Sequence, residues 1–337
     1  MDPVTQGAFG AIFAQTVSKR KKYLAGALLG CLAGMSADLD ILIRSSSDPL
    51  LRLEFHRQFT HSLIFIPFGA LIVAICTRFM FKKYLDWKDT LIMCFFGYAT
   101  HGLLDTCTSY GTQLFWPFSD QRVAWNNISI IDPLLTIPII VFIILTILKR
   151  KKWIALIGVS YIFLYLGFGL FQSYRAEEAG RLIAKERGHE INTITVKPSF
   201  GNLILWKVIY ENNNFYYVDA VRLLADKEYC IGTKIKKLNV LSDFPKLNKN
   251  SQQYTDINRF NWFSQGYLGI GRNKNIITDV RYSAVPNEVN GLWGIEIDLL
   301  KNNNEHVDWV VNRRNFGVQW DKFTGLLLGE NCRKTVN

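Results

Sequence analysis

The stretch His56-Arg57-Gln58-Phe59-Thr60-His61-Ser62 stands directly before an apolar run, residues 63–81, that is long enough to cross a lipid bilayer. Ionisable groups at the edge of hydrocarbon are costly, and they usually serve a function. Two histidines and an arginine at this place therefore need an explanation. The explanation depends on whether other polar residues of the chain meet them.

Polar residues also stand at the ends of the other apolar segments. These segments cover residues 3–17, 23–37, 90–104, about 130–148 and 153–171. The polar residues at their ends are Asp2, Asp38, Asp40, His101, Asp105 and Asp132. The pattern predicts a multi-pass α-helical membrane domain of about six helices, in which Gly26, Gly30 and Gly34 let neighbouring helices approach closely.

The 337-residue chain divides by composition into two domains. Residues 1–172 are dominated by apolar runs and form the predicted transmembrane domain that carries the polar site. Residues 173–337 have an ordinary polar composition. An amphipathic helix over 173–187, a helix near 254–267 and strand-like runs at 192–196, 203–210, 215–221, 276–282 and 293–299 predict a small α+β domain there.

The formal net charge of +11 does not point to nucleic acid. The densest basic runs, residues 19–22 and 149–152, lie between hydrophobic segments, as loops that set membrane topology do. With residues 78–88 these loops hold twelve Lys or Arg, whereas loops 38–60 and 105–130 hold four. The positive-inside rule places the basic loops in the cytoplasm. Six crossings then bring all the polar segment ends, and the C-terminal domain, to the extracytoplasmic face.

Imidazole and carboxylate groups at one face predict a divalent metal site. His101 and Asp105 are four residues apart and share one helix face. His61 adds a second imidazole, and Asp38 and Asp40 add carboxylates. This donor set suits zinc best, with manganese or iron as alternatives. The predicted metal ligands are Asp38, Asp40, His61, His101 and Asp105.

Three further residues form the predicted catalytic set. Arg57 has the fork geometry that binds an anionic substrate. Thr60, like Ser62, is placed to orient a metal-bound imidazole, and His56 is either such an orienting group or a substrate group. Asp2 and Asp132 each precede proline, so N-capping of a helix explains them at least as well as metal binding.

The six cysteines lack any Cys-x-x-Cys pair, which excludes a zinc ribbon or a thioredoxin-like motif. Cys31, Cys76 and Cys94 fall in apolar runs and are expected to be buried hydrophobes. Cys230 and Cys332 lie in the soluble part, where an oxidising compartment allows a disulfide; two unrelated buried thiols are the alternative. The N-terminus does not have the pattern of a cleavable signal peptide.

The polar motifs as a set resemble the membrane-bound predicted metal-dependent hydrolases, the YdjM-like inner-membrane proteins of bacteria. The motifs are Asp2-Pro3-x-Thr5, Asp38-x-Asp40, His56-Arg57-x-x-Thr60-His61-Ser62, His101-x-x-x-Asp105 and Trp116-Pro117-Phe118-Ser119, within residues 1–140. The resemblance implies a multi-pass protein of the bacterial inner membrane that is called a hydrolase by inference.

Three functions remain open. The first is a metal-dependent hydrolase at the extracytoplasmic interface, acting on a phosphate or carboxylic ester of a lipid-like substrate, with the bilayer as its partner. The second is a metal-free lipid phosphatase with a histidine nucleophile, although the basic-serine-histidine signature of such enzymes is missing. The third is a non-enzymatic transporter or assembly protein that binds an ion.

Overall fold

A computed structural model of the protein describes residues 1–271, 273–312 and 316–334. The chain divides into two compact units. Unit 1 contains residues 1–43, 55–171 and 200–202, and unit 2 contains residues 44–54, 172–199 and 203–337. Each unit is described by itself.

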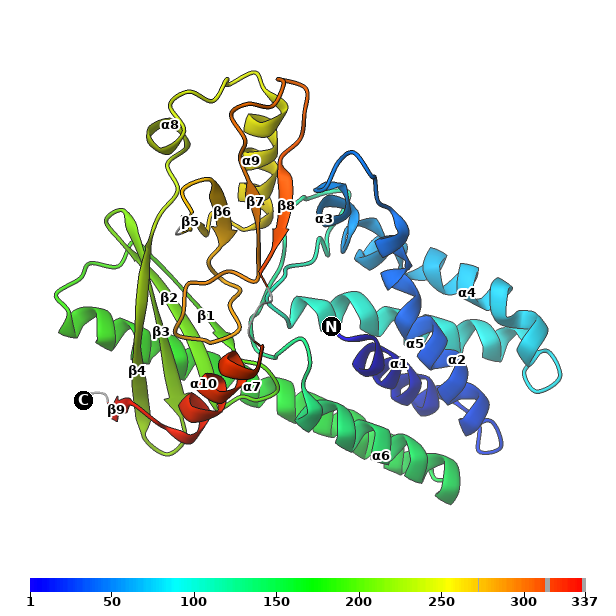
Figure 1. Ribbon diagram of the computed structural model, residues 1–337. Coiled ribbons are helices and arrows are strands. Elements are labelled where there is room, and N and C mark those ends of the chain that lie inside the picture. Colours follow the sequence, from blue (N-terminus) through cyan, green and yellow to red (C-terminus); the bar gives the residue numbers. More distant parts are fainter. Residues whose placement is uncertain (272, 313–315, 335–337) are drawn as a thin grey trace. The chain divides into compact units, whose positions relative to one another are not determined.

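Unit 1 is helical, and Figure 1 labels its elements. They are α1 (Pro3–Val17), α2 (Tyr23–Met35), the short 3₁₀ helix η1 (Ser36–Leu42), α3 (Leu51–Phe55), η2 (Phe59–His61), η3 (Leu63–Phe65), α4 (Ile66–Phe81), α5 (Trp87–Thr106), α6 (Pro133–Lys149) and α7 (Lys152–Glu186). Helices α3 and α7 contribute residues to both units.

The helices that begin after a polar residue are capped by it. The Asp2 carboxylate accepts hydrogen bonds from the backbone of Val4 and Thr5 at the start of α1, and the Asp132 carboxylate accepts one from Leu135 at the start of α6. Each aspartate satisfies amide groups that have no partner inside the helix. The capping alternative for Asp2 and Asp132 is therefore confirmed.

The predicted number of membrane crossings is not confirmed. Among the described residues, three stretches are both long and apolar enough to cross a bilayer: Tyr23–Leu42, Leu63–Phe81 and Lys152–Glu186. Helix α6 is apolar but has 17 residues, and α1 has 15. Since a straight crossing needs about 20 residues, these two helices are short for it, and six crossings stay a prediction.

Small residues bring α1, α2 and α5 together. A Cβ added at Gly30 would lie 2.3 Å from the carbonyl oxygen of Gly10, and one added at Gly34 would lie 2.6 Å from that of Gln6. The predicted role of the glycines at four-residue spacing in α2 is thus confirmed for these two. Close backbone approach of this kind is how helices pack where lipid removes the hydrophobic driving force.

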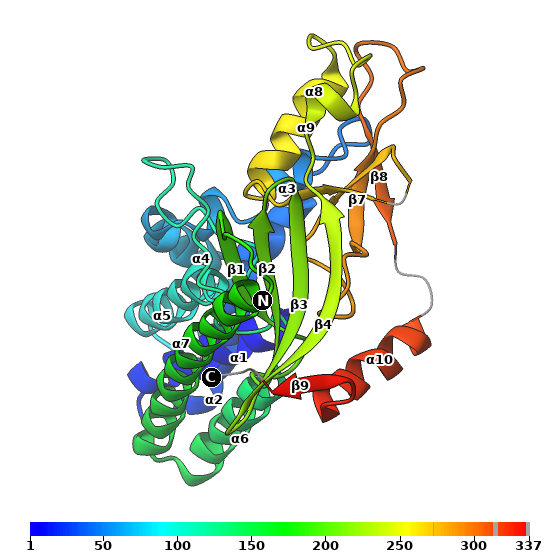
Figure 2. The ribbon, with the colours of Figure 1, turned by 90° about the vertical axis from the view of Figure 1, so that its left-hand side faces the viewer.

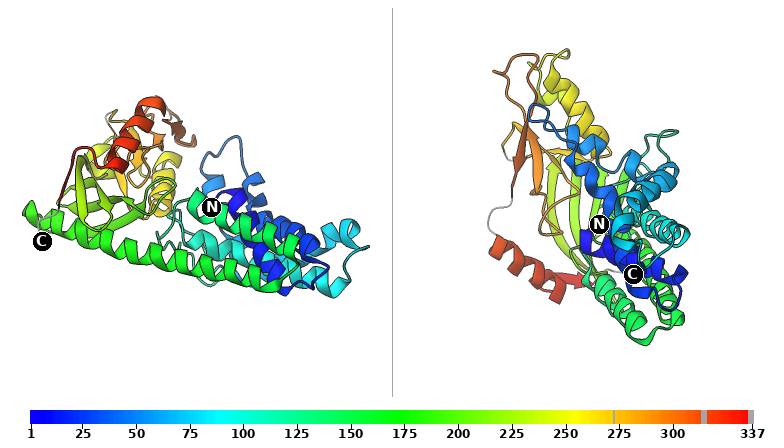
Figure 3. Two further views of the ribbon diagram at one scale, coloured as in Figure 1. Left: turned by 90° about the horizontal axis from the view of Figure 1, so that it is seen from below. Right: turned by 90° about the vertical axis from the view of Figure 1, so that its right-hand side faces the viewer.

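Helix α7 corrects the predicted break near residue 172. The sequence predicted an apolar span to residue 171 and a separate amphipathic helix from 173, but α7 is continuous over 35 residues. Figure 3 shows it as one unbroken helix (green). The change from apolar to polar composition was mistaken for a boundary, although no glycine or proline stands between residues 170 and 179 to end the helix.

Unit 2 has two antiparallel sheets. Strands β1 (Thr193–Pro198), β2 (Leu205–Asn212), β3 (Phe215–Leu223), β4 (Lys227–Lys236) and β9 (Cys332–Lys334) form the first sheet in that order, and β5 (Leu268–Ile270), β6 (Ile276–Asp279), β7 (Trp293–Glu296) and β8 (Asp308–Val311) form the second. Figure 2 shows the first sheet with α10 (Phe316–Leu328) near its lower end. Two further helices are α8 (Val240–Asp243) and α9 (Gln252–Phe263).

The predicted α+β character of this part is confirmed, while several strands were missed. The hairpin at residues 212–214 is present, and Asn213 takes the left-handed conformation that its turn requires (φ 52°). Strand β4 was not predicted because lysines at exposed positions give its sequence the polar composition of a loop. Cys230 and Cys332 form a disulfide that ties β9 to β4.

The core of unit 2 contains a buried ammonium group. The Nζ atom of Lys207 donates to the Ser283 hydroxyl at 2.7 Å and to the carbonyl oxygen of Glu288 at 2.9 Å. Burial lowers the pKa of Lys207 from 10.5 to about 7, although the negative charges of Asp279 and Glu288 oppose this shift. Folding therefore disfavours the protonated lysine.

We predict that the stability of the protein depends on pH through Lys207. Because the pKa is lower in the folded state, the unfolded chain binds more protons between about pH 7 and 10, and the folded state gains stability as the pH rises through this range. Thermal unfolding in detergent, followed by tryptophan fluorescence, measures this effect. The unfolding temperature of the wild type should rise relative to that of a Lys207→Met variant as the pH increases from 7 to 10. A difference that does not change with pH would contradict the prediction.

Candidate metal centre

The candidate site gathers residues from three elements of unit 1. Helix η1 continues α2 and carries Asp38 and Asp40, η2 carries His61, and the last turns of α5 carry His101 and Asp105. The predicted pairing of His101 with Asp105 on one helix face is present, since both are fully buried in α5.

Four of the five predicted ligands converge. One ligand atom from each of Asp38, His61, His101 and Asp105 lies within 4.8 Å of all the others. The Nε2 atom of His61 is 3.4 Å from Asp38 Oδ1 and 3.3 Å from Asp105 Oδ2. The Nε2 atom of His101 is 3.3 and 3.8 Å from the same two oxygens. The two Nε2 atoms are 2.9 Å apart.

Hydrogen bonds made by the Nδ1 atom of each ring determine whether its Nε2 atom carries a proton. His101 Nδ1 is 2.5 Å from the carbonyl oxygen of Gly34, which can only accept, so Nδ1 carries the proton. The Thr60 hydroxyl donates to Asp40 at 2.8 Å and therefore accepts from His61 Nδ1 at 2.9 Å. In the neutral rings both Nε2 atoms present lone pairs, and these point at one another and at two carboxylates.

Such an arrangement requires a positive charge in its middle. Burial disfavours protonation of His61, but the bonds that its ring makes to Asp105, Asp38 and Asp40 outweigh burial and raise its pKa to about 10. A proton on His61 Nε2 would bond to one acceptor and leave the other atoms uncompensated. Asp105 Oδ2, for example, is buried and lies 3.1 Å from Arg57 Nε, but it has no well-aligned hydrogen bond among the described residues.

The nitrogen–oxygen separations of the donor set are close to those of a divalent metal site. In a tetrahedral site with metal–ligand bonds of about 2.0–2.1 Å, the ligand atoms lie roughly 3.3 Å apart. Three of the four nitrogen–oxygen separations are 3.3 or 3.4 Å and the fourth is 3.8 Å. Two imidazoles that donate their other N–H outward, as both rings do here, are typical of metal-binding histidines.

Asp40 is placed to orient its neighbours. Its Oδ2 accepts from the backbone N–H of Arg57 at 3.1 Å and from Thr60, and its Oδ1 is 2.7 Å from His56 Nδ1. Asp38, Asp40 and His56 also have ligand atoms within 4.8 Å of one another. These three residues form a second candidate group of ligands beside the first, with Asp38 common to both groups.

Arg57 is buried, and its guanidinium group contacts other residues around the site. Its Nε is 3.1 Å from Asp105 Oδ2, its Nη1 donates to Thr108 at 2.9 Å, and the guanidinium lies over the Tyr110 ring at 5.2 Å. Its backbone has φ 66°, a left-handed conformation that a non-glycine residue adopts at a cost. The structure thus places Arg57 against a candidate ligand, and binding of an anionic substrate by this residue stays a prediction.

Sequence reasoning missed two other partners of Asp105. Gln6 Nε2 donates to Asp105 Oδ1 at 2.9 Å, and the amino group of Met1 pairs with the same oxygen. Gln6 could have been found, because it is a single amide near the start of an apolar segment. Both contacts are made by Asp105 Oδ1, whereas Oδ2 faces the two histidines and Arg57 Nε.

The comparisons with known proteins agree with a membrane protein of this kind. The profile of the YdjM inner membrane protein family matches residues 1–176. The uncharacterized protein YfhP of Bacillus subtilis (strain 168) is 24% identical over 195 residues. This match covers 57% of the present chain and 57% of YfhP, so the chain aligns with little more than half of that relative. No solved structure matches the chain.

Gly102 provides a test of the site's geometry. A Cβ added at Gly102 would lie 2.1 Å from the carbonyl oxygen of His61, whereas one added at Gly167 would meet nothing within 4 Å. We expect Gly102→Ala to move His61 and weaken metal binding by about 10- to 100-fold, the range seen when outer partners of metal ligands are lost. Zinc titration of both variants measures this, with Gly167→Ala as the matched control. Equal affinities would contradict it.

Proposed function

The chain belongs to the YdjM inner membrane protein family, and from its site we propose that it is a membrane-embedded hydrolase that depends on a divalent metal ion, most suitably zinc. The observation that carries the proposal is the convergence of two histidine lone pairs and two carboxylate oxygens. When bound, a divalent ion supplies Lewis acidity toward a phosphoryl or carbonyl oxygen and makes water a better nucleophile at neutral pH.

The residues divide into ligands and groups that position them. Asp38, His61, His101 and Asp105 would hold the ion. Among these four, the side chain of Asp38 is 24% exposed and the others are fully buried, so a substrate would approach from the side of Asp38.

His56 is the side chain best placed to act as a general base. Its Nδ1 contacts the Asp40 carboxylate, which fixes the proton on Nδ1 and leaves Nε2 as a free base. His56 is also partly exposed, at 28% of its side-chain surface. We assign it the role of accepting a proton from attacking water, while Thr60 and Asp40 hold His61 in its tautomer.

Exposed apolar side chains beside the site support a lipid-like substrate. Leu39 lies between the two site aspartates and is 64% exposed, and Leu63 and Ile64 directly follow His61 and Ser62 and are also exposed. An amphipathic ester could keep its chain against such residues while its polar end reaches Asp38. Phosphate and carboxylic esters both fit the proposed chemistry.

We expect His101→Ala to lower metal affinity by at least about 100-fold, because even outer partners of metal ligands contribute 10- to 100-fold. Hydrolysis of phosphatidic acid and of p-nitrophenyl acetate by detergent-purified protein should fall in parallel and should stop when a chelator is added. His189→Ala, in unit 2, is the control and should keep both properties.

Two outcomes would overturn this proposal in different directions. Phosphatase activity that survives the chelator but not His101→Ala would favour a histidine nucleophile. Stoichiometric metal without turnover of either ester would favour an ion-binding transporter or assembly protein.

We further propose that the basic loops face the cytoplasm and that the site and unit 2 are extracytoplasmic. The positive-inside count supports this orientation, and so does the disulfide between Cys230 and Cys332, because such bonds persist in oxidising compartments.

Maleimide labelling of unfolded protein isolated from cells tests the orientation. Cys31, Cys76, Cys94 and Cys107 are free thiols and serve as internal controls that label with or without prior reduction. Cys230 and Cys332 should label after reduction only. Labelling of all six cysteines before reduction, together with a cytoplasmic signal from a reporter fused to the C-terminus, would reverse the orientation.

A further inference from the structure

An inserted segment of unit 2 separates two parts of the chain that build the candidate metal centre. The inserted segment is residues 44–54, which belong to unit 2, whereas the residues directly before and after it belong to unit 1. Asp40 precedes the segment and His56 follows it. His56 Nδ1 pairs with Asp40 Oδ1 at 2.7 Å, and the backbone N–H of Arg57 donates to Asp40 Oδ2. These contacts close a loop that passes through the inserted segment.

The side chain of Arg259, in α9, holds the inserted segment. Its Nε donates to Glu54 Oε1 at 2.5 Å, and its Nη1 and Nη2 donate to the two carboxylate oxygens of Asp48 at 3.1 and 2.8 Å. Nη1 also donates to Asp256 at 2.8 Å. All four residues lie in unit 2. One guanidinium thus bonds to two carboxylates of the segment and to one of its own helix.

These contacts are largely shielded from water. The side chains of Arg259 and Asp48 are 17% and 18% exposed. Exposed single ion pairs contribute little, whereas a guanidinium that bonds to both oxygens of one carboxylate makes one of the stronger charged contacts. Leu50, between the two carboxylates of the segment, is also buried. The inserted segment is therefore anchored by charged and apolar side chains together.

Asp256 keeps Arg259 in place independently of the inserted segment. Asp256 is fully buried and accepts from Arg259, three residues further along α9. It also accepts from His306 Nδ1 at 2.8 Å and from the backbone N–H of Val307 at 3.2 Å. None of these partners belongs to the segment. Changes in the carboxylates of the segment can therefore release it while Arg259 keeps its ion pair within α9.

We propose that Arg259 is a positioning residue for the metal centre and acts, through the inserted segment, on the pairing of Asp40 with His56. A loop that is held at its far part loses less conformational entropy when its two ends are brought together than a free loop does. The bonds of Arg259 therefore favour the orientation in which Asp40 fixes the His56 ring. The inference rests on the proposed function, in which His56 accepts a proton from attacking water.

A double variant of the segment, Asp48→Asn with Glu54→Gln, tests the proposal. It removes both charges of the segment that Arg259 binds and leaves Arg259 paired with Asp256. Arg259→Lys is a second variant, which keeps the positive charge but loses the fork that bonds to both oxygens of Asp48. We expect it to act in the same direction as the double variant, with a smaller effect.

Limited trypsin digestion of the full chain in detergent measures whether the segment is released. Arg44 and Arg52 are exposed sites for trypsin within the segment. Cleavage after these two residues should become about tenfold faster in the double variant, because charged hydrogen bonds that keep the segment closed are lost. Cleavage at other sites of unit 2 should stay at the rate of the wild type.

Modification of His56 by diethyl pyrocarbonate, followed by mass spectrometry of the metal-free protein, measures the state of its ring. His56 should react about three times faster in the double variant, because weaker pairing with Asp40 leaves the ring more mobile. In ester hydrolysis kcat should fall about tenfold at an almost unchanged KM, because a misplaced general base affects the chemical step.

Glu228→Gln is the matched control. Glu228 pairs with Arg222 at 2.8 Å within unit 2, and both side chains are partly buried. This variant should leave cleavage in the inserted segment and modification of His56 unchanged. Unchanged cleavage and modification in the double variant, faster cleavage without any change at His56, or equal changes in the control would each overturn the proposal. A wild type that hydrolyses neither ester would contradict the proposed function instead, while digestion and modification still decide the role of Arg259.

Discussion

The contact between His61 Nε2 and His101 Nε2, at 2.9 Å, is the constraint on which the rest of unit 1 depends. Two lone pairs cannot be held this close without a cation between or beside them. Every neighbouring feature serves to keep both rings in this position. Gly34 accepts from one ring and Thr60 from the other, and Gly102 allows α5 to approach the backbone of His61.

The sequence predicted that Asp38, His61, His101 and Asp105 meet because each stands at the end of an apolar segment, and the positive-inside count favours one common side for these ends. It could not predict which carboxylate faces the histidines. Asp38 and Asp40 are two residues apart, and the tight turn of η1 separates their directions: Asp38 turns to the imidazoles and Asp40 to His56 and Thr60. That difference is set by backbone geometry after Met35, for which the sequence carries no signal.

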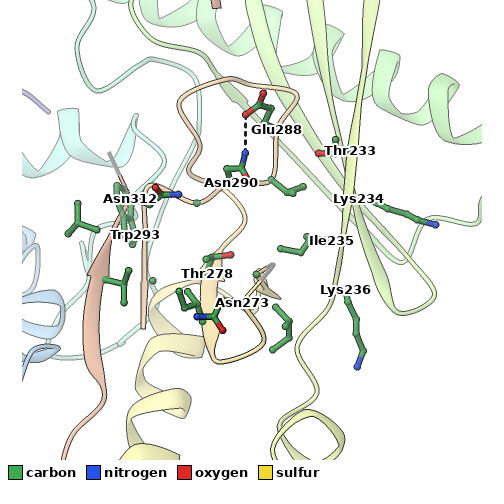
Figure 4. Close-up of a pocket in the computed structure, with 18 of the residues that line it drawn as sticks. Thr233, Lys234, Ile235, Lys236, Asn273, Thr278, Glu288, Asn290, Trp293 and Asn312 are labelled. Carbon is green, nitrogen blue, oxygen red and sulfur yellow. Dashed lines mark hydrogen bonds between the residues drawn. The ribbon is translucent and has the colours of Figure 1, made fainter. Parts of the chain in front are cut away.

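The soluble part was harder to predict for a related reason. Strands with one exposed face, such as β4, carry lysines at several of their exposed positions and resemble loops by composition. A cavity in unit 2 (Figure 4) is lined by segments that are far apart along the chain, from Thr233 to Lys322. No local pattern in the sequence predicts such a cavity, so it could be found only in the structure.

The balance of charge explains why the site attracts a cation. Counting side chains alone, the carboxylates of Asp38, Asp40 and Asp105 surround one guanidinium, that of Arg57, which leaves a charge of −2 next to apolar helices. Uncompensated charge at such a place is costly. The amino group of Met1, which pairs with Asp105, reduces this excess further, so either a proton or a divalent ion can balance the remaining charge, and the case for a metal rests on the convergence of the four ligand atoms. Arg57 contributes to this balance directly, because its Nε lies 3.1 Å from Asp105 Oδ2 and its guanidinium offsets one of the three carboxylates beside the two imidazoles.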